Sequence, residues 1–170
     1  MLLKLICINM TDVIGFPNYT INENGEIYSK KRKIIMKQKL NEKGYFMIGL
    51  TNNKIPKFLY VHRLVYQMFN LKNGEIMPAE VDHKNGNKTD NFKDNLRSAT
   101  SQQNNRNRGK NANTKSGHKN IRITQYGKFR VIIGIGNDKN YSKNFKILEE
   151  AIEHRNIKLT EFHGEFANNG

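Results

Sequence analysis

Residues 81–107 read VDHKNGNKTDNFKDNLRSATSQQNNRN, a stretch that places an acid beside an imidazole among many Asn residues. The dipeptide Asn85-Gly86 is typical of a turn between two strands. We therefore predict a strand at about 80–83, a polar loop, and a short return strand at 96–99. This strand pair decides how the centre of the chain folds.

A helix is predicted to follow the return strand. Thr100 and Gln103 have the spacing of a capping box, in which the two residues satisfy each other's free backbone N–H groups. Asn104 then lies in the first turns of the helix, with Arg108 four residues further along the same face. The predicted order is strand, loop, strand and helix.

The Asp82-His83 pair supplies two groups that phosphodiester hydrolysis needs. A carboxylate is a hard oxygen ligand for a divalent metal ion, and a neutral imidazole can take a proton from water near pH 7. The ion would stabilise charge on the scissile phosphate and on the leaving 3′ oxygen. Of the amides Asn95 and Asn104, one can hold the imidazole by a hydrogen bond and the other can offer its carbonyl oxygen to the ion.

Strand geometry sets a condition on this pair. Successive side chains of a regular strand point to opposite faces of the sheet. Asp82 and His83 can therefore serve one phosphate only if the strand ends or bends at this point, or if the metal ion and the water lie on different sides of the substrate.

The chain carries 29 Lys and Arg against 15 Asp and Glu, which gives a formal charge of +14 and a pI near 9.9. Such an excess raises affinity for polyanions, so nucleic acid is the expected partner, the alternative being a merely basic protein. No acidic residue occurs between Asn95 and Asn137. DNA contacts are expected from the basic residues Arg63, Arg97, Arg106, Arg108, Lys119, Arg122, Lys128, Arg130 and Lys143.

Other classes of protein are disfavoured by composition. Cys7 is the single cysteine, so the chain builds neither an internal disulfide nor a paired-cysteine zinc site, and its histidines lack zinc-finger spacing. The opening MLLKLICINM is about half as long as a membrane-spanning helix and has no small-residue cleavage site, so we predict a strand there. We expect a cytoplasmic protein with no membrane partner and no small-molecule cofactor.

The segment before the centre shows strand and then helix patterns. Alternating apolar residues around the turns at 24–25 and 42–44 predict short β-hairpins. Over residues 60–70, YVHRLVYQMFN, apolar residues recur at three and four, as one buried helix face requires. His62 and Arg63 lie off that face, and we interpret His62 as structural.

The segment after the centre begins with a basic linker at 109–116, rich in Gly, Asn and Ser. Alternation over 120–124, 129–135 and 141–145 predicts a three-stranded meander, and a helix follows from Leu148. The opposite sheet face is then basic. The face toward the helix can bury Ile121, Ile123, Phe129, Val131 and Ile133.

The central spacing resembles that of a known family. Asn95 follows His83 after eleven intervening residues and Asn104 follows after eight more, which resembles the His-Asn-His (HNH) nucleases in the variant that ends on Asn. The resemblance implies a ββα-metal fold with His83 as general base and Asn95 as the residue that orients it. It also implies one Mg²⁺ or Mn²⁺ held by Asp82 and by Asn104 or its neighbour Asn105.

The resemblance extends to both flanks. GFPNYTINENGEIYS and YVHRLV are similar to the module that precedes HNH cores in phage homing endonucleases, and SGHKNI, GKFRV, LEEA and EFHGEFAN resemble the Apetala-type DNA-binding domain. The implied fold class is α+β. Its parts are a β-hairpin module at 1–58, the nuclease core at 59–108, the linker at 109–116, and a three-stranded sheet plus helix at 117–170.

The expected function is that of a homing-type endonuclease which hydrolyses a phosphodiester in double-stranded DNA. We expect a monomer, acting in the cytoplasm of a bacterial host if a phage encodes it. The alternative is a non-catalytic, sequence-specific DNA-binding regulator that uses the flanking modules alone.

Overall fold

A computed structural model of the chain describes residues 9–109, 114–136 and 138–168. The strand predicted for the opening decapeptide lies almost wholly outside this part. Within the described residues, no helix has the length and apolar character needed to cross a membrane.

The chain divides into two compact units, Met1–Ala99 and Thr100–Gly170. The border falls between the return strand and the helix of the predicted central core. The domain borders expected after residues 58, 108 and 116 stay predictions.

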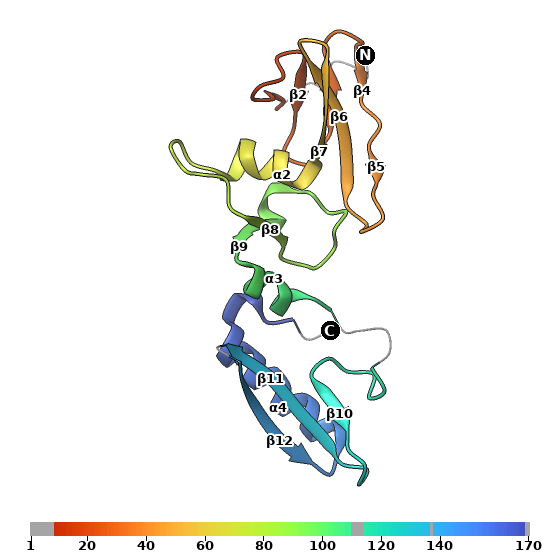
Figure 1. The fold of residues 1–170 in the computed structure, drawn as a ribbon, viewed down its shortest axis with the longest axis vertical. Helices are drawn as coiled ribbons and strands as arrows, with labels where there is room; N and C mark the ends of the chain where they lie inside the picture. Colours follow the sequence, from red (N-terminus) through yellow and green to blue (C-terminus); the bar gives the residue numbers. More distant parts are fainter. Residues whose placement is uncertain (1–8, 110–113, 137, 169–170) are drawn as a thin grey trace. The chain divides into compact units, whose positions relative to one another are not determined.

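Two antiparallel sheets open the first unit (Figure 1). The four-stranded sheet has the order β1-β2-β3-β4, with strands Thr11–Asp12, Tyr19–Ile21, Ile27–Ser29 and Ile34–Ile35. The three-stranded sheet has the order β5-β6-β7, with strands Lys39–Leu40, Phe46–Asn52 and Ile55–Tyr60. The hairpins predicted at 24–25 and 42–44 are confirmed, as the connections β2–β3 and β5–β6.

Helix α2, Val61–Val65, continues as a π-helical turn, Tyr66–Asn70, so the predicted helix is confirmed. His62 was expected off the buried face, but its side chain is also buried, with 7% exposure. The helix packs into a core to which both sheets contribute, and it buries there the apolar residues Val61, Leu64 and Val65.

Strands β8, Glu80–His83, and β9, Leu96–Ala99, pair antiparallel as predicted. The loop between them is tied to the preceding sheets. Lys93 Nζ forms an ion pair with Glu23 at 2.8 Å, and Lys88 Nζ donates a hydrogen bond to a backbone carbonyl of the β5–β6 turn at 2.9 Å. The strand pair is therefore an integral part of the first unit.

The second unit begins with α3, Ser101–Asn107, and the predicted capping box is confirmed. The backbone N–H of Gln103 donates to the Thr100 hydroxyl at 3.2 Å, and the N–H of Thr100 donates to the Gln103 side chain at 2.8 Å. These two bonds satisfy donors that the first helical turn would otherwise leave without partners.

The predicted meander follows as β10, Ile121–Ile123, β11, Phe129–Gly136, and β12, Lys139–Phe145 (Figure 1). Helix α4, Leu148–His163, packs on one face of this sheet and ends in a 3₁₀ turn, Gly164–Phe166. Strand order and helix are both as predicted.

The core of this sheet and helix confirms most of the predicted pattern. Ile123 was expected in the core, and this was wrong, because its side chain is 48% exposed. It pairs with Phe129 on the last rung of β10, beside the turn, where the sheet ends. The fully buried residues are Ile121, Val131, Ile133, Ala151 and Leu159.

Gly25 allows the β2–β3 turn to approach α2. Its φ is +84°, and a Cβ atom there would lie 2.7 Å from Val61 Cγ1. We expect Gly25→Ala to lower the free energy of unfolding by about 3 kcal/mol, since a left-handed φ costs ~1–2 kcal/mol and overpacking ~1–3 kcal/mol. Gly15→Ala is the matched control, because Gly15 has a φ of +77° and nothing within 4 Å of the added Cβ. Urea unfolding measures both, and equal losses would contradict the close approach.

Candidate active site

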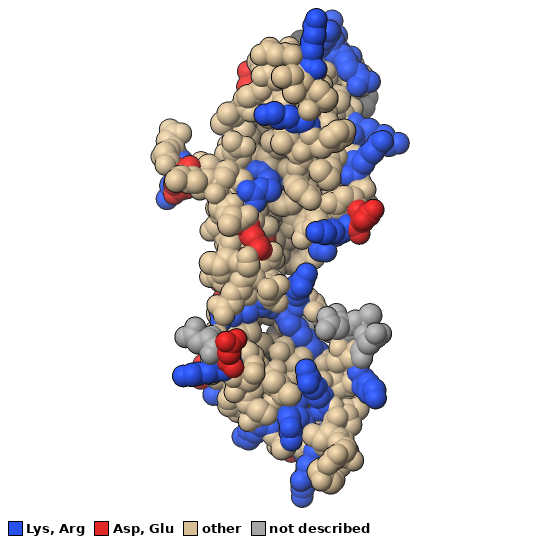
Figure 2. Space-filling view, in the orientation of Figure 1, with Lys and Arg blue, Asp and Glu red and all other residues tan. Residues whose placement is uncertain are grey.

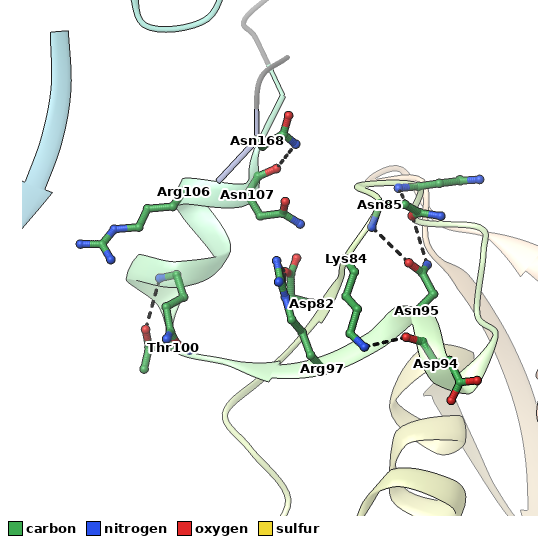
Figure 3. Close-up of polar contacts among 12 residues, drawn as sticks. Asp82, Lys84, Asn85, Asp94, Asn95, Arg97, Thr100, Arg106, Asn107 and Asn168 are labelled. Atoms are coloured by element: carbon green, nitrogen blue, oxygen red, sulfur yellow. Dashed lines mark hydrogen bonds and ion pairs between the residues drawn. The ribbon is translucent and has the colours of Figure 1, made fainter. Parts of the chain in front are cut away.

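Asp82 and His83 are the last two residues of β8, and both are buried, with 6% and 3% exposure. The strand ends at His83, which meets the condition that strand geometry set for the two side chains to act together. The neighbouring residues Lys84 and Asn85 already belong to the loop (Figure 3).

The Asp82 carboxylate faces the cross-strand neighbour Arg97 (Figure 3). Arg97 Nε donates a hydrogen bond to Oδ2 at 2.9 Å, and Nη2 lies 2.8 Å from the same oxygen. Arg97 was expected to contact DNA, but its side chain is only 9% exposed. The structure therefore places its guanidinium against the predicted metal ligand.

The His83 ring is held by Asn91, whose Oδ1 lies 3.1 Å from Nε2. A carbonyl oxygen only accepts, so with this amide orientation the proton is on Nε2 and the basic lone pair is on Nδ1. Burial lowers the pKa of His83 below its usual value, against the opposing effects of Asn91, Asp82 and Asp90. The imidazole is therefore neutral at pH 7, the form that a general base requires.

Asn95 was expected to orient His83, and the structure places its amide in the loop that precedes it. Asn95 Nδ2 donates to the Asp90 carbonyl at 2.8 Å, and Oδ1 accepts from the backbone N–H of Asn85 at 3.1 Å. These bonds close the loop that carries Asn91. Asn91 is a direct hydrogen-bond partner of the His83 ring. Sequence reasoning missed it because nothing distinguishes it among the many Asn residues of this loop.

Aromatic rings from two other elements pack around His83. The His62 ring of α2 lies 5.1 Å from the His83 ring between centroids, and the Tyr45 ring lies 5.1 Å from His62 and 6.0 Å from His83. Burial, with smaller effects of His83 and Arg63, lowers the pKa of His62 to about 3. Sequence reasoning missed the contacts of His62 and Tyr45 with His83, since the helical period alone placed His62 on the exposed side.

Asn104 lies in the first turn of α3, and its backbone N–H donates to the Thr100 carbonyl at 2.9 Å. It belongs to the second unit. The described residues contain no cluster of three or more His, Cys, Asp or Glu that could hold a metal. One carboxylate and one amide oxygen fit the hard-oxygen preference of Mg²⁺, provided that water and phosphate complete the shell.

Several predicted DNA contacts take part in internal bonds. Arg63 donates to the backbone carbonyls of Pro78 and Ala79, both at 3.0 Å. Lys119 Nζ donates to the Arg106 carbonyl at 2.6 Å, and burial, helped by Arg155, lowers the Lys119 pKa to about 8. These side chains support the backbone of their own units.

Other predicted contacts are exposed, and Figure 2 shows many Lys and Arg side chains on the visible face of each unit. Arg130 Nε donates to Asn144 Oδ1 at 2.9 Å on the sheet face opposite α4, and Lys143 Nζ lies 5.4 Å from the Phe145 ring centroid. Arg106 is half-buried. The remaining exposed members of the set are Arg108, Arg122 and Lys128.

Comparison with known proteins finds a family that is similar to the centre of the chain. Residues 59–106 match the family described as HNH endonuclease, a segment that contains the buried pair, the return strand and the start of α3. Over this segment the chain is similar to HNH endonucleases.

Proteins with similar sequences include one from a bacteriophage and one from a giant virus. The chain is 38% identical to DNA endonuclease I-HmuI of Bacillus phage SP01 over 90 residues, 52% of this chain and 51% of that protein. It is 32% identical over 87 residues to an uncharacterized HNH endonuclease of Acanthamoeba polyphaga mimivirus, 51% of this chain and 26% of that protein. The chain thus matches about half the length of the first relative and less of the second.

A solved structure shares the fold. The structure described as DNA binding and cleavage by the HNH homing endonuclease I-HmuI has a TM-score of 0.51 and 24% identity, covering 92% of this chain and 91% of that chain. This likeness shows the α+β fold.

The lowered pKa of His62 predicts a loss of stability in acid. The folded value of about 3 lies below the ordinary 6.5, so the stabilisation is complete above pH 6.5 and is lost as pH falls toward 3. We expect His62 alone to lower the free energy of unfolding by about 2 kcal/mol between pH 7 and pH 5. Urea unfolding of wild type and His62→Phe at both pH values measures this, because Phe keeps a ring without a titrating group. The same pH dependence in both proteins would contradict it.

Proposed function

We propose that this chain is a metal-dependent HNH endonuclease of the homing type that hydrolyses a phosphodiester of duplex DNA. The observation that carries the proposal is the geometry at the end of β8. A neutral His83 is fixed through Nε2 beside a buried carboxylate, inside the segment that matches the HNH family. The related phage enzyme is described as binding and cleaving DNA.

In the proposed reaction His83 is the general base. Its Nδ1 takes a proton from the attacking water, while Asn91 holds the proton on Nε2. Asn95 acts on His83 through the loop, by keeping Asn91 in place. A single Mg²⁺ or Mn²⁺, held by Asp82 and by Asn104 or Asn105, would stabilise negative charge on the phosphate and on the leaving 3′ oxygen.

The C-terminal sheet is proposed as a DNA-binding surface of Apetala type. Arg122, Arg130 and Asn144 lie on one rung across the three strands, and the strand alternation directs them away from the face that α4 covers. Exposed guanidinium groups without an acidic neighbour on that rung suit a phosphate backbone or a base edge. The protein would act on DNA as a monomer.

The first test is cleavage of supercoiled plasmid. His83→Ala should lower the rate of nicking in Mg²⁺ by about 10²–10⁴-fold, the contribution of a general base, with DNA affinity unchanged within about twofold. His118→Ala serves as the control histidine, since His118 lies in neither the base nor the DNA-contact set.

The same assay separates the two candidate functions. Wild-type nicking should stop when EDTA removes the metal ion and return when Mg²⁺ is added. Binding of duplex DNA without any nicking by the wild type would favour the alternative, a non-catalytic DNA-binding regulator.

A second test concerns the C-terminal sheet. Neutralising Arg122 or Arg130 by Met should weaken DNA binding and reduce the slope of log K against log salt by about 1, because one counterion-releasing contact is lost. Fluorescence anisotropy at several salt concentrations gives the slope. A slope equal to that of the wild type would remove the residue from the contact surface.

A further inference from the structure

The side chain of Arg97 is buried beside Asp82, which is not expected of a DNA contact. It lies on β9 directly opposite Asp82, and its side chain is 9% exposed. Nε and Nη2 lie 2.9 Å and 2.8 Å from Oδ2 of Asp82. A cation that binds phosphate from solution is exposed, whereas this one is buried beside a carboxylate.

The Asp82 carboxylate also depends on the Arg97 guanidinium. Asp82 is 6% exposed, and removing one partner of a buried ion pair takes a compensating charge from the other, which is strongly unfavourable. A carboxylate in that state turns toward water when its side chain can rotate. The pair therefore fixes the direction of the Asp82 side chain as well as its charge.

The pairing of β8 with β9 sets the direction of the Asp82 side chain. Because Asp82 and Arg97 are register partners, their side chains leave the same face of the two-stranded sheet. The Arg97 guanidinium is planar, and β9 fixes where its side chain starts. Rotation of the Asp82 carboxylate would therefore break its contacts with both Nε and Nη2. This gives Asp82 the support that metal-binding carboxylates receive from neighbouring hydrogen-bond donors.

We propose that Arg97 is a positioning residue which holds the Asp82 carboxylate in the orientation for binding the divalent metal ion, and that it is not a DNA phosphate contact. The inference rests on the proposed function, in which Asp82 is a metal ligand. It assigns to Arg97 an effect on metal affinity and none on the electrostatic part of DNA binding.

The experiment compares Arg97→Met and Arg97→Lys with wild type in the full chain. Met keeps the length of the side chain without charge or donors, and Lys keeps the charge without the planar head. Three quantities are measured: the Mg²⁺ concentration that gives half-maximal nicking, Mn²⁺ binding to DNA-free protein by electron paramagnetic resonance, and the salt slope of DNA binding without metal. Arg122→Met is the matched control for a lost DNA contact.

We expect Arg97→Met to raise the half-saturating Mg²⁺ concentration about 10- to 100-fold and to weaken Mn²⁺ binding by a similar factor, the usual effect of losing a residue that supports a metal ligand. Arg97→Lys should lie between Met and wild type. The salt slope should equal that of the wild type, while Arg122→Met lowers it by about 1.

Two results would overturn the inference. A salt slope lowered by about 1 with unchanged metal dependence would make Arg97 a phosphate contact. Unchanged metal dependence and unchanged slope would leave it a structural ion pair. A wild type that binds Mn²⁺ but does not nick DNA would instead reject the proposed function, and Mn²⁺ affinity would still decide the role of Arg97.

Folding is controlled separately. Asp82→Asn combined with Arg97→Met removes both charges, so the double variant should resist urea better than Arg97→Met alone. If Arg97→Met does not fold, Arg97→Lys carries the comparison, because it retains the buried charge. A double variant less stable than the single one would contradict the pairing itself.

Discussion

The register of β8 against β9 is the constraint on which the candidate site depends. In this register Asp82 lies opposite Arg97, and His83 lies opposite Leu96. A slip of one residue would send every side chain of a strand to the other face. The carboxylate would then lose its guanidinium, and His83 would lose the bond to Asn91. Hydrogen bonds within the loop and the buried apolar residues at both strands hold the register in place.

The N-terminal sheets support the site directly. The ring of Tyr45, from the turn between β5 and β6, and the ring of His62, from α2, pack against His83. Ties from Lys88 and Lys93 fix the loop to the same sheets. In the first unit the hairpins and the strand pair therefore form one structure, and a base held by packing on several sides is restricted to few orientations.

Local chemistry in the sequence was enough to predict most elements. A capping box, an Asn-Gly turn and alternating apolar residues each depend on a few neighbouring residues, so the helix start at Thr100 and the hairpins follow from them. The roles of His62 and Arg97 depend on residues farther along the chain, and nothing in the sequence distinguishes Asn91 from the other Asn residues of its loop. The helical period placed His62 outside the core, because a period describes one helix and not the loops and strands that pack on it. The positive charge of Arg97 suggested a DNA contact, because Asp82 was considered only as a metal ligand.

We propose that the Asp82 carboxylate and the Asn104 amide share one divalent ion at the scissile phosphate, with His83 beside it. The most direct measurement is a crystal structure of the protein with an uncleavable duplex and Mn²⁺, using the anomalous signal of the metal. We expect one anomalous peak about 2.0–2.3 Å from an oxygen of Asp82, of Asn104 and of the phosphate. A peak bonded to neither residue, or a His83 ring turned away from that phosphate, would contradict it.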